Sequence, residues 1–398
     1  MINIRKVDQL PLTEGSRVFY RVDYNVPLEG VEISDATRIE ETVQTLQFLR
    51  GRGAAIVIAS HLGRPKGTRN AKYSLAPVRA KLAELLGGID VQWADDCVGA
   101  EAEEKASKLG PGEVLLLENL RFHEGEEKNN AAFAEQLKKL ADFYVNDAFG
   151  ASHRAHGSID ALPRLFPKEN IAGGFLLAKE IEFLQKVTDI EERPFVALMG
   201  GAKIAGKIEP LEALVKLADK VLIGGGMANT FLAARGVPMG GSLVDKESLE
   251  VAQRIMESDH RAEIILPFDL VVADSLDDPQ EIDYDADVAD GYTDEEKAFD
   301  IGPKTIATYE AELRDAKLVF WNGPMGVFEK EVFAKGTMAM ARAVANVDAV
   351  TVVGGGESVE AIKASGFADK ITHISTGGGA SLEFISGASL PGVEVLRT

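Results

Sequence analysis

Ten apolar runs of five or six residues recur along the chain and alternate with segments of helical periodicity. Four of these runs lie at 17–22, 54–59, 113–118 and 142–146, and six lie at 195–199, 220–224, 263–267, 317–321, 349–353 and 371–375. Near-continuous apolar strands separated by helices are typical of parallel sheets that are covered by helices on both faces. Ten such strands within 398 residues predict an α/β fold with two sheets in two domains.

A charged, helix-like segment separates the two groups of runs. The stretch GFLLAKEIEFLQKVTDIEERP (174–194) repeats apolar residues at helical spacing and is closed by Pro194. We interpret 176–194 as an interdomain helix that joins an N-terminal domain, 1–175, to a C-terminal domain, 195–379.

The chain has a formal net charge of −20, which constrains its partners. An acidic surface repels nucleic acid and anionic membranes, so we expect no partner of either kind. The only cysteine, Cys97, excludes a disulfide within the chain and any multi-cysteine metal site, and the default expectation is a cytoplasmic setting. The N-terminal stretch 1–15 lacks the apolar core of a signal peptide. The very acidic tract 276–300 has no strong periodicity, and we interpret it as a solvated surface excursion.

Basic and polar side chains follow the strands of the first half, where ligands of open parallel sheets bind. These residues are Asp23, Asn25, Ser60, His61, Arg64, Asn119, Arg121, His123, His153, Arg154 and His156, and Arg38 lies early in the first helix-like segment. A single arginine of this kind is most simply a solvated surface residue. Several at one sheet edge favour a site for a small, multiply charged anion. Of the histidines, His123 and His156 can equally be structural.

Glycines follow the strands of the second half instead. They occur at 200–201, 224–226, 323 and 326, 354–356, and 377–379. Glycine lets backbone N–H groups approach a phosphate or a flat base, although tight turns between strands and helices also use it. Five such loops at one sheet edge favour a nucleotide site over turns alone.

The stretch 201–207, GAKIAGK, matches the phosphate-binding P-loop pattern up to its last position, where Ile208 stands in place of Ser or Thr. An anion site in one domain and a nucleotide site in the other favour a group-transfer enzyme. Two alternatives stay open: a P-loop NTPase built on this stretch, and a non-catalytic, two-domain ligand-binding protein. No G-x-G-x-x-G occurs, so a dinucleotide cofactor is not supported.

Along essentially its whole length the chain resembles the phosphoglycerate kinase family, through RVDYNVP, SHLGRPKG, LENLRFHEGEEKN, NDAFGASHRAHGS, GGAKIAGKI, GGGMANTF, FWNGPMGVFE, GGGES and STGGGASLE. The resemblance implies two Rossmann-like three-layer domains whose parallel sheets face a cleft, with a C-terminal tail, about 380–398, packing back on the first domain. It further implies reversible phosphoryl transfer between 1,3-bisphosphoglycerate with ADP and 3-phosphoglycerate with ATP, in glycolysis and gluconeogenesis, by a cytoplasmic, Mg²⁺-dependent monomer.

The resemblance also assigns residues. The phosphoglycerate would be bound by Asp23, Asn25, Arg38, His61, Arg64, Arg121 and Arg154. The nucleotide would be bound by Lys203, Lys207, Gly224, Gly225, Gly302, Glu329, Gly355, Gly356, Glu357 and Ser358, with Glu357 at the metal. The catalytic residues would be Arg38, Lys203 and Gly379.

Two positions depart from the family pattern, which commonly has Asp where Glu357 stands and often a polar residue where Gly206 stands. The acceptor of the implied reaction is a carboxylate, which is already ionised at neutral pH, so no general base is required. We expect catalysis to rest on alignment and on charge neutralisation by Arg38 and Lys203, with closure of the two domains excluding water.

Overall fold

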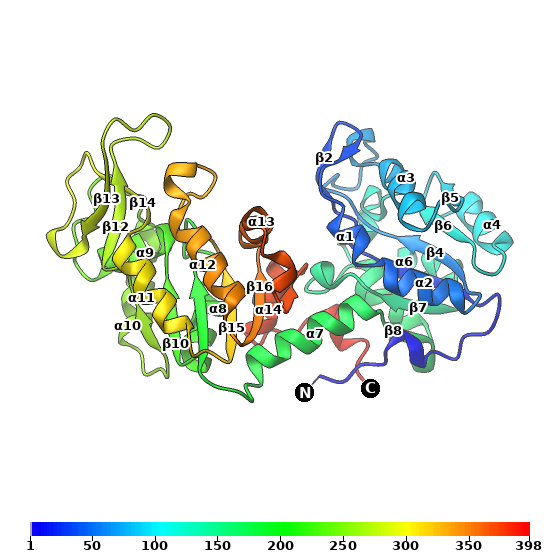
Figure 1. Cartoon of the computed structure of the whole chain (residues 1–398). Coiled ribbons are helices and arrows are strands. Elements are labelled where there is room, and N and C mark those ends of the chain that lie inside the picture. The colour runs from blue at the N-terminus through cyan, green and yellow to red at the C-terminus, as the bar shows by residue number, and fades with distance from the viewer. Residues whose placement is uncertain (1) are drawn as a thin grey trace. The chain divides into compact units, whose positions relative to one another are not determined.

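The structure is a computed structural model that describes residues 2–398, and the chain divides into two compact units (Figure 1). The first unit runs up to Glu182 and also contains Ser389–Thr398, and the second unit is Phe183–Ala388. The boundary falls inside α7 (Phe175–Thr188), whereas the sequence places a whole helix, 176–194, between the domains.

The first unit is built on a six-stranded parallel sheet with the strand order β5-β6-β4-β1-β7-β8. Its strands are β1 (Arg17–Arg21), β4 (Ala55–Ala59), β5 (Val91–Ala94), β6 (Val114–Leu117), β7 (Phe143–Asn146) and β8 (Ile171–Gly173). A short antiparallel hairpin joins β2 (Leu28–Glu29) to β3 (Glu32–Ile33). The helices are α1 (Thr37–Glu40), α2 (Val43–Gly51), α3 (Ala76–Leu85), α4 (Ala100–Lys108), α5 (Glu124–Glu127), α6 (Ala131–Lys138) and α15 (Pro391–Glu394).

Both faces of this sheet are buried, which explains why its strands read as near-continuous apolar runs. On one face, Val18 and Tyr20 of β1 belong to the same buried cluster as Leu46 of α2. On the other face, Phe19 stacks on Tyr144 of β7, with 6.1 Å between the ring centroids.

The two ends of the chain meet in the first unit. Ile4 forms an antiparallel bridge with Arg397, and the N–H of Thr398 donates to the carbonyl of Asn3 (3.2 Å). Figure 1 shows the two termini side by side below the first sheet. The sequence-based tail of about 380–398 is longer than this segment, because α14 (Gly379–Ile385) still belongs to the second unit.

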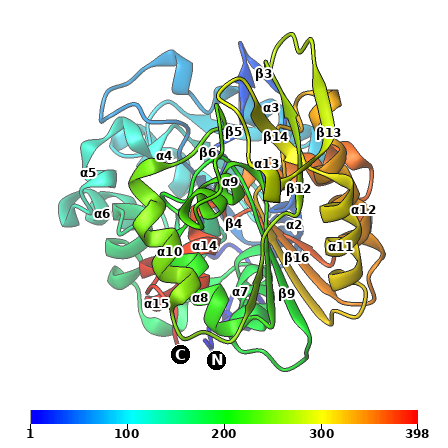
Figure 2. The ribbon, with the colours of Figure 1, turned by 90° about the vertical axis from the view of Figure 1, so that its left-hand side faces the viewer.

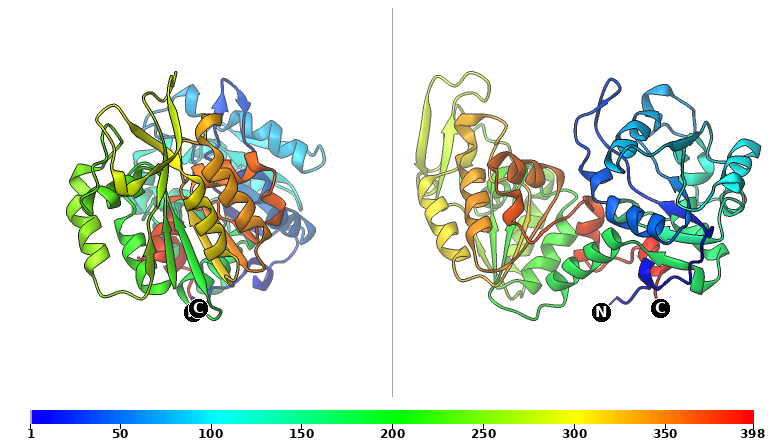
Figure 3. Two further views of the ribbon diagram at one scale, coloured as in Figure 1. Left: turned by 60° about the vertical axis from the view of Figure 1, so that its left-hand side comes forward. Right: turned by 45° about the vertical axis from the view of Figure 1, so that its right-hand side comes forward.

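The second unit is built on another six-stranded parallel sheet, with the order β11-β10-β9-β15-β16-β17. Its strands are β9 (Phe195–Met199), β10 (Lys220–Ile223), β11 (Glu263–Ile265), β15 (Leu318–Asn322), β16 (Val350–Gly354) and β17 (His373–Ile374). The other helices are α8 (Ile208–Leu217), α9 (Gly225–Ala234), α10 (Leu249–Glu257), α11 (Pro303–Leu313), α12 (Lys335–Asn346) and α13 (Gly356–Ser365). Figures 2 and 3 show α8 and α10 on one side of the strands and α11 and α12 on the other.

The α/β fold predicted from the ten apolar runs is thus confirmed, and each run coincides with a strand of one of the two parallel sheets. The sequence analysis missed the strands β5 and β8 at the two edges of the first sheet. Within residues 2–398, no helix is long and apolar enough to cross a bilayer.

The interpretation of the acidic tract 276–300 as a mere surface excursion is wrong. A third sheet, antiparallel and ordered β13-β12-β14, joins β12 (Asp269–Ala273) to β13 (Ile282–Asp287) and β14 (Lys297–Ile301). The tract escaped notice because the acidic side chains of β13 are exposed while its backbone pairs with β12. The strict alternation of IDYDAD was the available signal, and charged side chains also protect such an edge strand from further pairing.

Candidate active site

The first group of candidate site residues gathers at the carboxyl ends of the strands of the first sheet. Asp23 follows β1, His61 follows β4 and Arg121 follows β6, while Arg38 comes from α1. These three strands neighbour one another in the order β6-β4-β1, so their ends meet at one edge of the sheet.

Asp23 is the anionic centre of this group. Its carboxylate accepts a hydrogen bond from Nη1 of Arg38 (2.7 Å) and lies 3.8 Å from Nε2 of His61. Burial alone would raise the pKa of Asp23, but its electrostatic interactions with His61 and with the guanidinium groups of Arg38 and Arg21 lower it to about 2. The Asp23–Arg38 pair is therefore ionised at neutral pH, and the guanidinium is held at the sheet edge before any ligand arrives.

His61 is neutral at neutral pH. Burial lowers its pKa well below the usual value against the pull of Asp23, and the nearby guanidinium groups of Arg121, Arg21 and Arg38 lower it further. The neutral ring can therefore donate or accept a hydrogen bond without adding charge.

Arg21, which the sequence analysis missed, lies fully buried beneath this site. Its Nη2 lies 3.3 Å from Nδ1 of His61, and its Nε donates to Oγ of Ser158 (2.7 Å). The buried carboxylate of Glu126 accepts from the Ser158 hydroxyl (2.6 Å) and lies 3.7 Å from Arg21. A charged residue inside the apolar run RVFYRV was the available signal, because a buried charge requires a buried partner.

The chain after β4 is tied to the same edge. Oδ1 of Asn25 accepts from the N–H of Gly63 (2.8 Å), and Nη1 of Arg121 donates to the Gly63 carbonyl (2.8 Å). Gly63 has a φ of +61°, and a Cβ there would lie 2.3 Å from the Tyr73 ring, so only glycine fits. Arg121 is nearly buried, and its Nε atom has no hydrogen-bond partner in the part of the chain described here.

The other basic residues predicted at this sheet edge differ in their exposure. Arg64 and Arg154 are exposed, and Nε of Arg154 lies 3.0 Å from Nε2 of its neighbour His153. His156 is buried, and burial together with Arg121, Arg21 and Arg154 lowers its pKa to about 3. His123 forms its hydrogen bond with Asp96, with 2.6 Å between Nε2 and Oδ1, and not with a residue of the Asp23 group.

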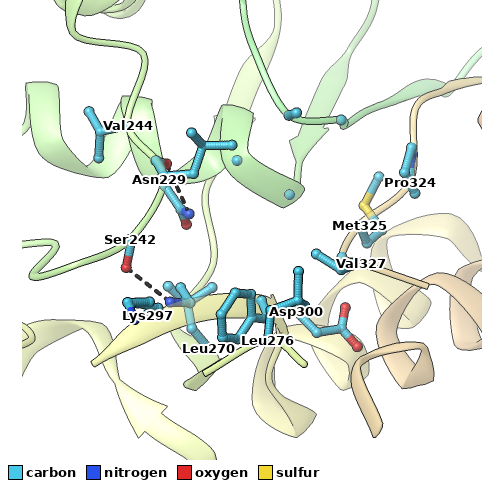
Figure 4. A pocket seen from close by; sticks show the side chains of 18 of the residues that line it. Asn229, Ser242, Val244, Leu270, Leu276, Lys297, Asp300, Pro324, Met325 and Val327 are labelled. Atoms are coloured by element: carbon cyan, nitrogen blue, oxygen red, sulfur yellow. Dashed lines mark hydrogen bonds between the residues drawn. The ribbon is translucent and has the colours of Figure 1, made fainter. Parts of the chain in front are cut away.

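The second group of candidate site residues lies at a pocket of about 630 Å³ in the second unit, shown in Figure 4. It is lined by Gly201, Ala202, Gly225, Gly226, Asn229, Gly241, Ser242, Leu243, Val244, Leu270, Leu276, Lys297, Ala298, Phe299, Asp300, Pro324, Met325, Gly326, Val327, Glu329 and Glu357. The volume suits a nucleotide-sized molecule, and apolar walls with a few polar groups are usual for such sites.

Glycines beside this pocket allow three backbone segments to come into contact, namely the loops after β9 and β15 and the start of α9. The loops after β9 and β15 meet where the strand order reverses, and a Cβ on Gly200 would lie 2.1 Å from the carbonyl oxygen of Pro324. Gly225 has a φ of +63°, and its Cβ would lie within 3.0 Å of backbone atoms of Gly201 and Pro324. The glycines are therefore required by the close approach of three backbone segments.

Lys207 and Glu357 converge on the same point. Nζ of Lys207 donates to the carbonyl of Gly200 (2.9 Å), and a Cβ on Gly201 would lie 3.1 Å from that Nζ and 3.9 Å from Oε2 of Glu357. Burial lowers the pKa of Lys207, and the charge of Glu357 opposes this. Lys203 is exposed in the loop between β9 and α8.

Several polar side chains of the pocket are already bonded to the protein. Nδ2 of Asn229 donates to the carbonyl of Leu243 (3.3 Å), and Oγ of Ser242 accepts from the N–H of Ala298 (2.9 Å), as Figure 4 shows. Nζ of Lys297 donates to the carbonyl of Asp274 (2.7 Å). The walls therefore hold their shape through these bonds.

The remaining predicted nucleotide residues are not among those that line this pocket. Gly224 precedes α9, and Gly355 has a φ of +91° and packs on Asn322 directly before Gly356, the first residue of α13. The Ser358 hydroxyl is buried and accepts from the N–H of Gly323 (2.5 Å). Gly302 lies directly before α11, against Asp269, and Gly379, predicted as catalytic, begins α14.

Asp300 is a pocket residue that the sequence analysis missed, because it belongs to the unrecognised strand β14. Its carboxylate accepts from the N–H groups of Gly336 (2.7 Å) and Ile301 (2.9 Å), so it braces the start of α12. Burial raises the pKa of Asp300 to about 7, against the effect of these two donors.

We therefore expect Asp300→Asn to gain stability relative to the wild type as pH rises from about 4 to about 7, because the ionised, buried carboxylate is costly and the unfolded chain ionises near 3.8. Below pH 4 both states carry the proton and the pH-dependent part of the difference vanishes, and above pH 7 this part levels off at no more than about 4 kcal/mol. Thermal unfolding across this range measures it, with the exposed Asp278→Asn as a control that should stay flat. Equal differences at pH 5 and pH 8 would contradict the assignment.

Fold and residues together indicate a class: an α/β group-transfer enzyme with a cluster of basic side chains at the edge of one doubly wound sheet and a glycine-bordered, nucleotide-sized pocket on another. The family model described as "Phosphoglycerate kinase" matches residues 7–388. The chain belongs to the phosphoglycerate kinase family, and it is a kinase that transfers a phosphoryl group to a carboxyl acceptor.

Individual relatives agree with this membership. The chain is 52% identical over 386 residues to a phosphoglycerate kinase of Moorella thermoacetica, covering 96% of each chain. It is 47% identical to a chloroplastic phosphoglycerate kinase of Volvox carteri, covering 96% of this chain and 83% of that one. Among solved structures, phosphoglycerate kinase from Coxiella burnetii superposes with a TM-score of 0.88 at 36% identity and covers 99% of both chains.

Proposed function

We propose that the chain transfers the γ-phosphoryl group of ATP to the carboxylate of 3-phosphoglycerate, and catalyses the reverse reaction from 1,3-bisphosphoglycerate and ADP. The observation that carries this proposal is the pairing of Arg38 with the ionised Asp23 beside the neutral His61 at one sheet edge. A second sheet in the same chain supplies a nucleotide-sized pocket bordered by glycine loops.

The arginines divide into two roles. The exposed Arg64 and Arg154, together with the nearly buried Arg121, hold the phosphate that is not transferred, because guanidinium groups bind phosphate through paired hydrogen bonds. Arg38 stabilises the charge on the moving phosphoryl group, and Asp23 orients it. Asn25 and His61 bind the remaining polar groups of the acid.

The nucleotide occupies the pocket of the second unit. Its base and ribose lie between the apolar walls, and Glu329, one of the polar residues of the lining, binds the ribose. The phosphates lie toward Gly201, Glu357 and Lys207, and the N–H groups at the start of α13 and α14 supply further donors. Lys203, in its exposed loop, reaches the transferred group, and the backbone of Gly379 does the same.

A magnesium ion fits this corner of the pocket. Glu357 lines the pocket with a carboxylate, which is a hard oxygen ligand, and Mg²⁺ is typically held by one or two carboxylates plus substrate phosphates. The longer side chain of Glu357, in place of the more common Asp, keeps this chemistry. When bound, the ion would neutralise negative charge on the nucleotide phosphates.

No general base is needed, since the acceptor carboxylate is ionised at neutral pH. What the chain must provide is alignment of the acceptor with the γ-phosphorus and positive charge around the transferred group. Neutral His61 agrees with this division, because it contributes hydrogen bonds rather than proton transfer.

A coupled assay with ATP and 3-phosphoglycerate tests the proposal against its rivals. Turnover that requires both compounds supports it. Hydrolysis of ATP without the acid would favour a P-loop NTPase, and binding without turnover would favour a ligand-binding protein.

Glu357→Gln should lower turnover about tenfold or more and raise the Mg²⁺ concentration needed for half-maximal rate, because one ligand charge is lost. Ile208→Thr, which completes the P-loop pattern, should leave both quantities unchanged. The comparison needs only steady-state rates across a Mg²⁺ titration. A gain in rate from Ile208→Thr would restore the P-loop interpretation, and an unchanged Mg²⁺ requirement in Glu357→Gln would remove Glu357 from the metal site.

The two ligands are assigned to different units, so transfer requires the units to close and exclude water. We expect small-angle scattering to show compaction when 3-phosphoglycerate and nucleotide are both bound, and little with either alone. An unchanged radius of gyration with both ligands would count against closure. We further propose a monomer in the cytoplasm, with no nucleic-acid or membrane partner, in line with the net charge of −20.

A further inference from the structure

Three side chains of the first unit converge at a point that the proposed reaction does not use. They are Asp96 and Cys97, which follow β5, and His123, which precedes α5. One ligand atom from each, namely a carboxylate oxygen, the thiol sulfur and a ring nitrogen, lies within 4.8 Å of the other two. Thiolate, imidazole and carboxylate are the ligand types that zinc takes in proteins.

The three side chains are held in this arrangement by the fold. Oδ1 of Asp96 accepts from the N–H of Cys97 (2.6 Å) and lies 2.6 Å from Nε2 of His123. The His123 ring stacks on Phe133, with centroids 5.4 Å apart and an angle of 26° between the planes. Residues 26 positions apart in the sequence are thus brought together by the strand ends of one sheet edge.

The site is open on one side and closed on the other. The Asp96 and His123 side chains are 44% and 32% exposed, whereas Cys97 is fully buried behind them. A cation can therefore reach the two outer ligands from solvent. Tetrahedral zinc bond lengths imply separations of roughly 3.5 Å between ligand atoms, so the three atoms must move closer together on binding.

From this geometry we propose that Asp96, Cys97 and His123 form a site for one thiophilic divalent cation, Zn²⁺ being the physiological example. The cation takes the thiolate sulfur, one imidazole nitrogen and one carboxylate oxygen, and water completes the coordination. The thiol proton is released to solvent on binding. The ring proton that His123 shares with Asp96 moves to the other ring nitrogen, so that two bonds to the metal replace this hydrogen bond. This site is separate from the Mg²⁺ position at Glu357, which offers oxygen ligands only.

Titration of the chelator-treated full chain with Co²⁺ tests the proposal, because Co²⁺ reports a thiolate ligand through charge-transfer absorption in the near ultraviolet. We expect one equivalent of Co²⁺ to develop this band and Zn²⁺ to abolish it. Cys97→Ser should remove the band. His123→Gln and Asp96→Asn should weaken binding by at least the 10–100-fold that loss of an outer-shell partner costs.

Glu357→Gln is the matched control and should leave the band and the affinity unchanged. His123 is only partly buried, so its variant tests the site even if substitution of the buried Cys97 impairs folding, which circular dichroism would reveal. The proposal is overturned if no thiolate band forms at one equivalent, or if His123→Gln binds Co²⁺ as the wild type does. Either outcome would leave His123 and Asp96 as a hydrogen-bonded pair only.

Discussion

Arg38→Ala should lower kcat about 10²–10³-fold, the usual cost of removing a group that stabilises transition-state charge. Arg38 is held by Asp23 at 2.7 Å, so its guanidinium is already in place when substrate binds and costs little to order. Its removal also leaves the Asp23 carboxylate without its closest cation, next to an anionic substrate. The rate is therefore expected to fall through both lost attraction and added repulsion.

Steady-state kinetics with both substrates measures this effect. Arg52→Ala is the matched control, because Arg52 is an exposed arginine at the C-terminal end of α2 in the same unit, and its loss should change neither kcat nor KM. Arg38→Lys should recover only part of the rate, since an ammonium group keeps the charge but not the planar pair of donors. Near-normal turnover of a folded Arg38→Ala enzyme would show that Arg38 is not catalytic.

Gly200→Ala should destabilise the second unit by about 3 kcal/mol or more and abolish nucleotide binding. The added Cβ would lie 2.1 Å from the Pro324 carbonyl oxygen and 2.8 Å from that of Gly323. Neither carbonyl can withdraw alone, because β9 and β15 are paired up to Met199 and Asn322, and the Gly200 N–H donates to the Asn322 carbonyl (2.9 Å). The loops after β9 and β15 must therefore move apart, and both of them line the pocket.

Calorimetry and titration with a fluorescent nucleotide check this expectation, and a drop in Tm of roughly 6–12 °C is expected for a unit of this size. Gly51→Ala in α2 is the control, because its Cβ would meet no atom within 4 Å and alanine favours the helix. Unchanged nucleotide affinity in Gly200→Ala would mean that the contact between these loops does not shape the site.

The parallel sheets could be predicted because burial on both faces leaves a strong mark on the sequence. The runs at 195–199 and 54–59 are buried along their whole length in β9 and β4. The strand β5 was missed because its two central residues, Gln92 and Trp93, are only partly buried at the sheet edge and break the apolar run. Strand β8 was missed because it has only three residues.

Candidate site residues could be placed in the fold from the apolar pattern where they follow a recognised strand. Asp23, His61 and Arg121 lie at one sheet edge, as their positions after such strands predict, and the glycine loops around Gly200 and Gly225 follow strands of the other sheet. Lys297 and Asp300 were missed because they line the pocket from an antiparallel strand inside the acidic tract. Contacts between side chain and backbone also cannot be predicted from the sequence pattern. One example is the hydroxyl of Ser358, which accepts a hydrogen bond from the N–H of Gly323.

The segment Ser389–Thr398 has a consequence for how the protein is made. Leu390, Val393 and Leu396 are buried in the first unit, and the N–H of Gly392 donates to the carbonyl of Ser152 (2.9 Å). A ribosome synthesises the rest of this unit before the second unit, and these ten residues only after it. The unit that is begun earlier is thus completed later, because the second unit has to be synthesised before the first can reach its final packing.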